Sequence, residues 1–307
     1  MAVFFDTVKN SRRKFLRADV LMQFIYINIA VFVLVIVTSL IGKLTSINIA
    51  GYREYAELPS SFNLFLRQPW TLVSYMFLHY DLLHIVFNML WLFWFGRIFL
   101  SFFNARQLGA LYMLGGIGGG LLYLVAFNLI PFFANQGVGY MIGASASVLA
   151  IVVAPAVVAP NYTLRLFFFG NVKLKYIVFV VILLDVYFLS MSPSNDGNHG
   201  GHLAHLGGAL VGFLFAWRFS KGKDITRWIS RCLDVFWNFL NKKPTMKVTI
   251  NNAKTKKQQQ TTQNNTNSEK NDNTGEEELN RILDKLKQSG YENLSADEKK
   301  KLFNASR

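Results

Sequence analysis

Long apolar runs separated by short polar stretches dominate the first two thirds of the chain. The first run, from Val20 to Ile41, is long enough to cross a lipid bilayer. Further runs of helical length follow at residues 82–100, 107–130, 143–160, 174–191 and 202–219. This pattern predicts an all-α membrane protein, a polytopic bundle of six transmembrane helices over residues 20–219.

The polar segment at residues 1–19 carries several basic side chains and predicts a cytoplasmic N-terminal segment. The segment at 43–81 is too long for a simple turn and too interrupted to span. It predicts an outer loop that dips partly into the interface, where Trp70 and Tyr75 would anchor it. Ordinary loop packing would give the same pattern.

The composition of the chain beyond residue 219 divides it into three segments, 220–250, 251–275 and 276–307. Residues 220–250 predict an amphipathic membrane-surface segment, or a continuation of the sixth span, because apolar side chains recur there at helical spacing: Ile225, Trp228, Ile229, Cys232, Leu233, Phe236 and Leu240. Residues 251–275 are rich in Gln, Asn, Thr and Lys, which predicts a disordered linker.

Residues 276–307 predict a small cytoplasmic helical pair with a possible cytoplasmic partner. Leu279, Ile282, Leu283 and Leu286 form the stripe of a first helix that ends at Gly290. Ser295 and Glu298 form a capping box that opens a second helix. No chemistry is visible in this pair.

Composition and charge agree with a membrane protein. The chain is 52% hydrophobic and only 16% charged, which is too apolar for an ordinary soluble domain. Its net charge of +14 would suggest nucleic acid in a soluble protein. Here the positive charge follows the positive-inside rule if both termini are cytoplasmic, so the lipid bilayer is the expected partner and nucleic acid is not. The expected inner loops hold Arg97, Arg106, Arg165, Lys173, Lys175, Arg218, Lys221, Lys223, Arg227 and Arg231.

The first apolar run lacks a small-x-small cleavage site near its end, so it predicts a retained anchor rather than a signal peptide. Asp6 stands early in the chain, and the anchor begins by Val20. No organellar presequence is evident, which favours a bacterial inner membrane.

Polar side chains from three separate spans are expected at one depth below the outer surface. With the N-terminus inside, Ser145 lies near the outer end of the fourth span and His205 near that of the sixth. His84 and Asn88 lie near the outer end of the second span, four residues apart and hence on one helix face. Polar groups at membrane depth are costly and mark function by default.

Ser145 stands among small residues, from Gly143 to Ser147, which leave its hydroxyl uncovered. A hydroxyl that meets an imidazole is the minimal pair of nucleophile and base, and nearby side-chain donors suit an oxyanion. The pattern predicts a serine hydrolase, while a structural polar cluster and a transport pathway remain alternatives.

At these residues the chain resembles the rhomboid family of intramembrane serine proteases. The motifs are Trp70, the stretch His79 to Asn88 (HYDLLHIVFN), Gly143-Ala-Ser145, and Ala204-His205-Leu-Gly207-Gly208. Their order is specific, whereas each motif alone is weak. The resemblance covers roughly residues 20–219.

The resemblance implies a Ser–His dyad without a third carboxylate and without a cofactor. Ser145 would be the nucleophile and His205 its general base, while His84 and Asn88 would line the oxyanion hole. His79 would support the outer loop, with Gly143 and Trp70 as further supporting residues. The implied substrates are transmembrane segments of other proteins, cut near the outer membrane face.

The chain departs from the family pattern at three positions. Ala146 stands where many members have a glycine after the nucleophile, and Leu149 stands where some members have an aromatic residue. Thr71 follows Trp70, where a Trp-Arg pair is common in the family. These differences affect the fit of the substrate and the orientation of the histidine more than they affect the dyad.

Two other polar features compete for a role. His199, His202 and His205 are spaced by three, but Gly200 and Gly201 suggest that His199 precedes the helix, so no metal site is predicted. Asp185 is a lone acid in the fifth span and is expected to be neutral or hydrogen-bonded within the bundle.

The sequence therefore predicts an intramembrane serine endopeptidase. The alternatives are an inactive relative that binds membrane clients and a transporter. A transporter should have charged or broken helices near mid-membrane, whereas these polar groups cluster toward one surface.

Overall fold

The computed structural model describes residues 19–46, 54–135, 137–166, 170–191, 199–240, 280–286 and 294–305. Within this part, five helices are long and apolar enough to cross a membrane. They are α2 (Val20–Thr45), α6 (Leu82–Leu100), α7 (Ala105–Leu129), α10 (Leu174–Met191) and α11 (His199–Ser220). The protein is mostly helical and crosses the membrane several times, as predicted.

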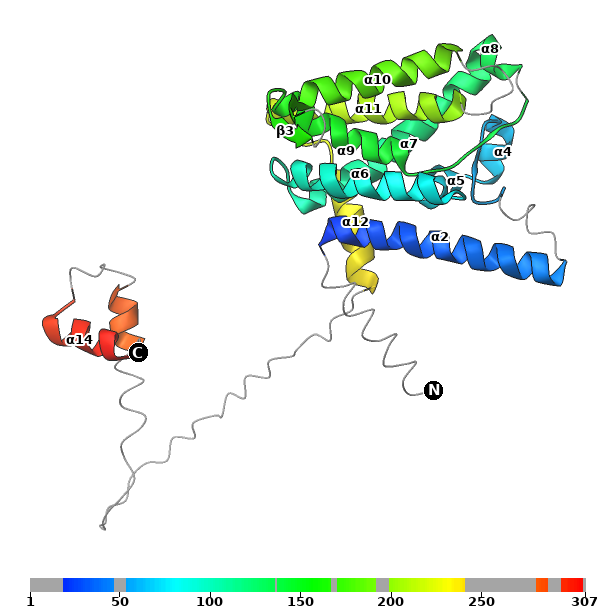
Figure 1. Cartoon of the computed structure of the whole chain (residues 1–307). Helices are drawn as coiled ribbons and strands as arrows, with labels where there is room; N and C mark the ends of the chain where they lie inside the picture. Colours follow the sequence, from blue (N-terminus) through cyan, green and yellow to red (C-terminus); the bar gives the residue numbers. More distant parts are fainter. Residues whose placement is uncertain are drawn as a thin grey trace. The chain divides into compact units, whose positions relative to one another are not determined.

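The fourth predicted span is the short helix α9 (Ser145–Val158), which has 14 residues and is therefore only about 21 Å long. Residues 146–156 are all buried, because α6, α7, α10 and α11 surround the helix. Figure 1 shows α9 inside the bundle and α2 along α6 at its edge. A helix that is apolar all round is stable in such a central position, where it has no need to match the thickness of the bilayer.

Glycines bring α11 against two neighbours. A Cβ on Gly208 would lie 2.1 Å from the carbonyl oxygen of Ala146, so the α11 and α9 backbones touch there. Gly212 lies against α9 in the same way. Gly207 faces α7, since a Cβ there would lie 2.7 Å from the Gly118 oxygen. Adjacent helix positions point about 100° apart, so a glycine pair contacts two partners.

The loop between α2 and α6 is built from short elements. They are β1 (Leu58–Pro59), α4 (Phe62–Arg67), α5 (Thr71–Ser74) and the 3-10 turn η1 (Tyr75–Phe77). Strand β1 pairs antiparallel with β2 (Tyr140–Met141), and the short helix α8 (Pro131–Ala134) precedes β2. The loop is therefore tied to the segment that leads into Ser145.

The two aromatic residues of this loop differ from each other. Trp70 is 53% exposed and donates its Nε1–H to the Tyr55 carbonyl at 2.7 Å. Tyr75 is buried, and its hydroxyl donates to the Gly116 carbonyl at 2.6 Å. The prediction that Tyr75 anchors the loop at an interface is wrong, because the hydroxyl finds its partner inside the bundle.

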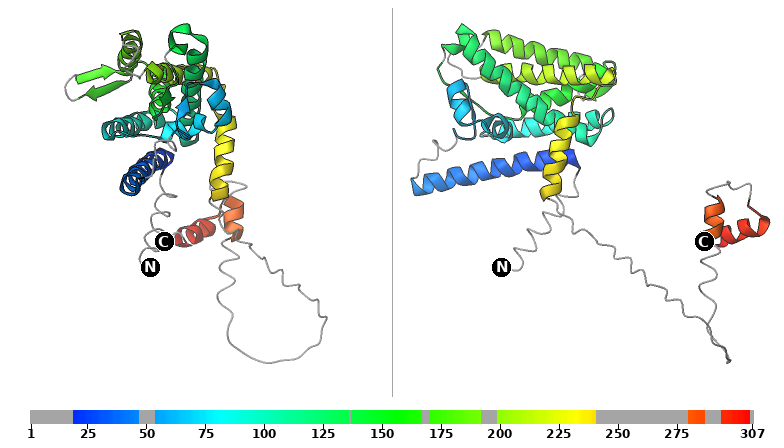
Figure 2. Two further views of the ribbon diagram at one scale, coloured as in Figure 1. Left: turned by 90° about the vertical axis from the view of Figure 1, so that its right-hand side faces the viewer. Right: turned by 180° about the vertical axis from the view of Figure 1, so that it is seen from behind.

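A hairpin that the sequence did not predict joins α9 to α10. Strands β3 (Thr163–Leu166) and β4 (Gly170–Lys173) pair antiparallel, with Thr163 opposite Lys173. Figure 2 shows the hairpin projecting from the bundle. The alternation of polar and apolar side chains over four residues is too short to separate a strand from a loop by sequence.

The end of α11 is linked to the start of α7. Asn104 and Gln107 form a capping box at α7, and the Gln107 side chain donates to Asp224 at 2.9 Å. Since α11 ends at Ser220, the following helix α12 (Arg227–Leu240) is separate. The structure thus has a helix within the predicted segment 220–250, and it is not a continuation of α11. Its place at the membrane surface stays a prediction.

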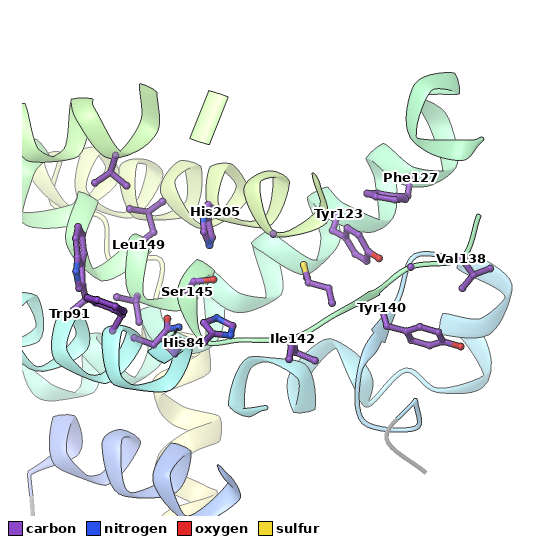
Figure 3. Close-up of a pocket in the computed structure, with 18 of the residues that line it drawn as sticks. His84, Trp91, Tyr123, Phe127, Val138, Tyr140, Ile142, Ser145, Leu149 and His205 are labelled. Carbon is purple, nitrogen blue, oxygen red and sulfur yellow. Dashed lines mark hydrogen bonds between the residues drawn. The ribbon is translucent and has the colours of Figure 1, made fainter. Parts of the chain in front are cut away.

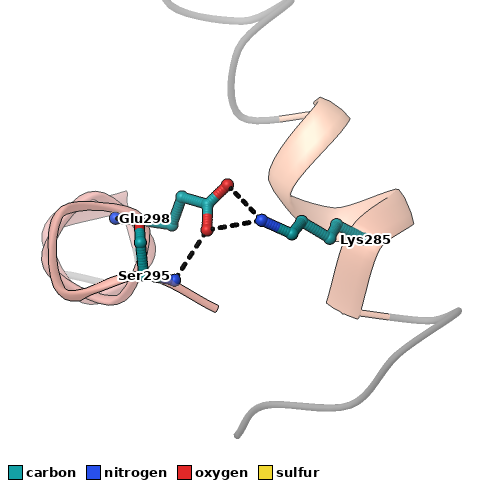
Figure 4. A network of polar contacts seen from close by, with 3 residues as sticks. All are labelled: Lys285, Ser295 and Glu298. Atoms are coloured by element: carbon teal, nitrogen blue, oxygen red, sulfur yellow. Dashed lines mark hydrogen bonds and ion pairs between the residues drawn. The ribbon is translucent and has the colours of Figure 1, made fainter. Parts of the chain in front are cut away.

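The chain divides into two compact units, Met1–Pro244 and Thr245–Arg307. In the second unit, residues 280–286 are helical and α14 runs Ala296–Ala305. The predicted capping box is present: the Ser295 N–H donates to Glu298 Oε2 at 2.7 Å, and the Glu298 N–H donates to Ser295 Oγ at 3.3 Å. Lys285 pairs with the same carboxylate, as Figure 4 shows. The predicted linker at 251–275, Leu279 and Gly290 lie outside the described residues.

Candidate active site

A cavity of about 1000 Å³ lies at the end of the bundle where α6, α9 and α11 begin. Ser145, His205, His84 and Asn88, the four residues predicted to do chemistry, all line it. In the view of Figure 3, Ser145 lies between the rings of His205 and His84. The rest of the wall is mainly apolar and aromatic. It includes Leu149, one of the departures from the family pattern, and residues that sequence reasoning did not single out: Trp91, Tyr123, Phe127, Tyr140 and Val181.

Ser145 is the first residue of α9 and follows a turn that requires glycine. Gly143 has φ +114°, and its amide donates to the Tyr75 carbonyl at 2.9 Å. A Cβ at this position would lie 2.8 Å from the His84 ring, so only glycine fits. The first backbone N–H groups of a helix have no partner within the helix and favour negative charge. The turn thus presents the hydroxyl beside donors that suit an anion.

Asn88 and His84 share one face of α6. Asp81 caps the helix by accepting from the His84 N–H at 2.9 Å. The Asn88 side chain donates to the His84 carbonyl at 2.9 Å. A carboxamide has two N–H donors, so one remains for a ligand in the cavity.

His79 does not line the cavity but contacts Ala144, the residue before Ser145. The ring is buried, and its Nε2 accepts from the Ala144 N–H at 3.4 Å, a long hydrogen bond. Burial, together with the neighbouring His84, lowers the pKa of His79 to about 4, so the ring stays neutral and can accept. The structure therefore places His79 against the residue before Ser145. Its support of the outer loop stays a prediction.

His205 has a carboxylate partner, contrary to the dyad without a third carboxylate that the resemblance implied. Its Nδ1 lies 2.7 Å from Asp185 Oδ1 in α10, and His202 Nδ1 lies 2.8 Å from the same oxygen. Asp185 is hydrogen-bonded within the bundle, as expected. Helix α11 begins at His199, so the expectation that His199 precedes the helix is wrong.

The ligand atoms of Asp185, His202 and His205 lie within 4.8 Å of one another and could bind a metal ion. Two of these separations, 2.7 and 2.8 Å, are ordinary hydrogen-bond lengths. Adjacent ligands of a tetrahedral zinc ion stand farther apart, about 3.3 Å. The described arrangement is therefore a hydrogen-bonded one.

Ser145 and His205 both line the cavity. Among the hydrogen bonds of the described residues, none joins these two side chains. Catalytic hydrogen bonds are often long before substrate binds. The cavity still brings together a hydroxyl (Ser145), an imidazole that could act as a base (His205), and hydrogen-bond donors from side chains and from the backbone at the start of α9.

Comparison with known proteins agrees with these features. The family model of the rhomboid domain matches residues 66–222, just over half of the chain, from the end of α4 past the end of α11. "RHOMBOID-like protein 12, mitochondrial" of Arabidopsis thaliana is 32% identical over 162 residues, 50% of this chain and 47% of that protein. "RHOMBOID-like protein 5" of the same plant is 30% identical over 149 residues, 47% of this chain and 42% of that protein.

The chain thus spans less than half the length of each of these relatives. The matched residues contain α6, α7, α9, α10 and α11, and hence every residue of the cavity wall. Helix α2 and the C-terminal unit lie outside the match. The chain belongs to the rhomboid family.

Proposed function

We propose that this protein is an intramembrane serine endopeptidase that cuts transmembrane segments of other proteins. The observation that carries the proposal is the meeting of Ser145, His205, His84 and Asn88 in one cavity inside a bundle of apolar helices. Family membership supports proteolysis as the general activity. The cavity is large enough to hold both water and an unwound piece of polypeptide.

In the proposed reaction the Ser145 hydroxyl attacks a peptide carbonyl while His205 takes its proton. The tetrahedral oxyanion accepts hydrogen bonds from His84, Asn88 and the first backbone N–H groups of α9. His205 then protonates the leaving amine, and the peptide bond breaks to give an acyl-Ser145 ester. Water, deprotonated by His205, hydrolyses that ester and restores the serine.

The experiment is cleavage of a fluorescently tagged single-span protein by the purified enzyme in liposomes. We expect two fragments, with the cut near the membrane surface on the cavity side. The mass of the fragments locates the cut. Stable binding of the substrate without a cut would favour the alternative, an inactive relative that binds membrane clients.

Replacement of Asn88 by Ala should lower kcat by about 100-fold, because one donor to the oxyanion is lost. KM should change little, since the donor acts mainly on the charge that develops in the transition state. Cleavage kinetics in liposomes measure both. Asn28→Ala is the matched control: Asn28 is a buried amide in α2, outside the cavity, whose side chain donates to Tyr112. A loss of equal size in both variants would count against an oxyanion role for Asn88.

The proposed orientation puts both termini in the cytoplasm and the cavity at the outer face of a bacterial inner membrane. Cys232, the chain's one cysteine, is exposed in α12. Its labelling shows on which side of the membrane α12 lies. A membrane-impermeant maleimide should label it in inside-out vesicles and leave it unlabelled in intact spheroplasts. Labelling in intact spheroplasts would reverse the orientation. Cys232→Ser provides the background.

A further inference from the structure

Asp185 of α10 contacts two histidines of α11, His202 and His205, of which His205 lines the cavity. The buried residues of α10 are Leu174, Val178 and Asp185, so most of this helix faces outward. The Asp185 side chain is only 7% exposed, and its Oδ1 contacts His202 Nδ1 at 2.8 Å and His205 Nδ1 at 2.7 Å. An ionisable group at membrane depth is costly unless it is paired and used.

The chemistry of these contacts fixes the proton on His205. An ionised carboxylate can only accept hydrogen bonds, and one oxygen has lone pairs for two donors. Both rings must then carry their proton on Nδ1. His205 Nε2 is left with its lone pair, and this is the atom that a general base needs.

His202 contacts the same carboxylate oxygen, Oδ1, as His205 does. It stands three residues before His205 on the same face of α11, and it does not line the cavity. Its ring stacks on Phe188 of α10, with centroids 5.6 Å apart and planes 21° apart. A ring fixed in this way donates to Asp185 from a defined position.

Among the described residues, the one hydrogen bond of the His205 ring is to Asp185. Its ring contact is an edge contact to His202, with centroids 5.9 Å apart. Leu149, which lines the same cavity, has no polar atom to offer it. Since a free imidazole can rotate and change tautomer, the orientation of His205 depends on Asp185.

We propose that Asp185 is a positioning residue for His205: its carboxylate, held by His202, keeps the proton on Nδ1 and directs Nε2 to Ser145. This inference rests on the proposed function, in which His205 is the base. It turns the Ser145–His205 pair into a triad whose third member comes from α10. His202 acts one step farther away, on the carboxylate.

Asp185→Asn tests the proposal because it keeps the size of the side chain and changes its hydrogen bonding. The amide can donate to Nδ1, which moves the ring proton to Nε2 and removes the base. We expect kcat for liposome cleavage to fall at least about 100-fold while KM stays within about twofold. Asp224→Asn is the matched control, since Asp224 also accepts side-chain hydrogen bonds but lies away from the cavity. A purely structural role would lower the melting temperature without this loss of kcat, and unchanged kcat in Asp185→Asn would overturn the proposal.

A second measurement needs no activity and reads the tautomer in the parent protein. The chain has only five histidines, so ¹⁵N-histidine labelling of the parent protein gives a small set of ring signals. His205→Gln assigns the signal of His205. We expect Nδ1 to carry the proton and Nε2 to be bare, and the reverse pattern would overturn the proposal. If the parent neither cleaves nor reacts with a serine probe, the proposed function fails, while the tautomer still decides the role of Asp185.

Metal analysis of the purified protein separates the proposal from the metal site that the same three residues could form. We expect no zinc that depends on Asp185, and no change of cleavage on addition of a chelator. One zinc ion per chain in the parent, lost in Asp185→Asn, would overturn the proposal.

Discussion

Ser145→Ala should lower the rate of substrate cleavage by at least about 10⁴-fold, to the level of protein-free liposomes. The Ser145 hydroxyl is the one nucleophile that the proposed reaction uses, and without it no acyl-enzyme can form. Residual catalysis by the donors alone would have to use water directly, which is far slower. The measurement is the initial rate of appearance of the cut fragment in liposomes.

Ser147→Ala is the matched control for this result. Ser147 stands two residues later in α9 and is fully buried, with its hydroxyl 3.9 Å from the Met76 sulfur, and it does not line the cavity. We expect its rate to stay within about threefold of the parent, since a buried hydroxyl without a strong partner contributes little. Equal loss in both variants would mean that the helix, rather than the Ser145 hydroxyl, had been damaged.

Gly208→Val should destabilise the bundle by at least about 3 kcal/mol and remove most of the active protein. A Cβ at this position would lie 2.1 Å from the carbonyl oxygen of Ala146, which is backbone and cannot move aside. Helix α11 would have to separate from α9, and His205 would leave the Ser145 wall of the cavity. Thermal unfolding in detergent, followed by loss of helical signal, measures the stability.

Leu210→Val is the control for the effect of a β-branched valine in α11, apart from the clash at position 208. Leu210 lies two residues farther along α11 and is 54% exposed, on the outside of the bundle. Its replacement by the same valine should shift the melting temperature by only a few degrees, as surface changes usually do. A Gly208→Val protein that melts with the parent would show that the contact between α11 and α9 is not needed.

The sequence predicted the four residues of the cavity because helix length and alternation of direction determine their depth. Ser145, His205, His84 and Asn88 each stand a few residues from the same end of their helices, so topology alone brings them to one level. Which faces turn toward one another depends on packing. Gly208 contacts α9 and Gly207 contacts α7, and their sequence positions alone do not distinguish these partners.

Asp185 was missed as a partner of His205 because the start of α11 was placed too late. In the structure both residues stand six positions from the ends of their helices, Asp185 before Met191 and His205 after His199. By sequence, the glycines at 200 and 201 suggest that His199 precedes the helix, and this shorter helix hides the equal depth of Asp185 and His205. Gly200 packs against the Tyr123 ring, so its lack of a side chain serves a close contact inside the helix.

The burial of Tyr75 could not be predicted from the sequence either. An aromatic residue with a hydroxyl suits both a membrane interface and a bundle interior that offers a free acceptor. The acceptor is the carbonyl of Gly116, 41 positions away, and local sequence does not report such a contact. The same holds for the β1–β2 pairing, which joins residues about 80 positions apart.

Labelling with a fluorophosphonate tests the central claim most directly, because the probe reports an activated serine and needs no knowledge of the substrate. The purified parent protein should gain one adduct, located on Ser145 by peptide mass. His205→Ala should react at least about 100-fold more slowly, since the base that activates the hydroxyl is gone, and Ser147→Ala should react like the parent. Absence of any adduct in folded parent protein, or an adduct that persists in Ser145→Ala, would contradict the account.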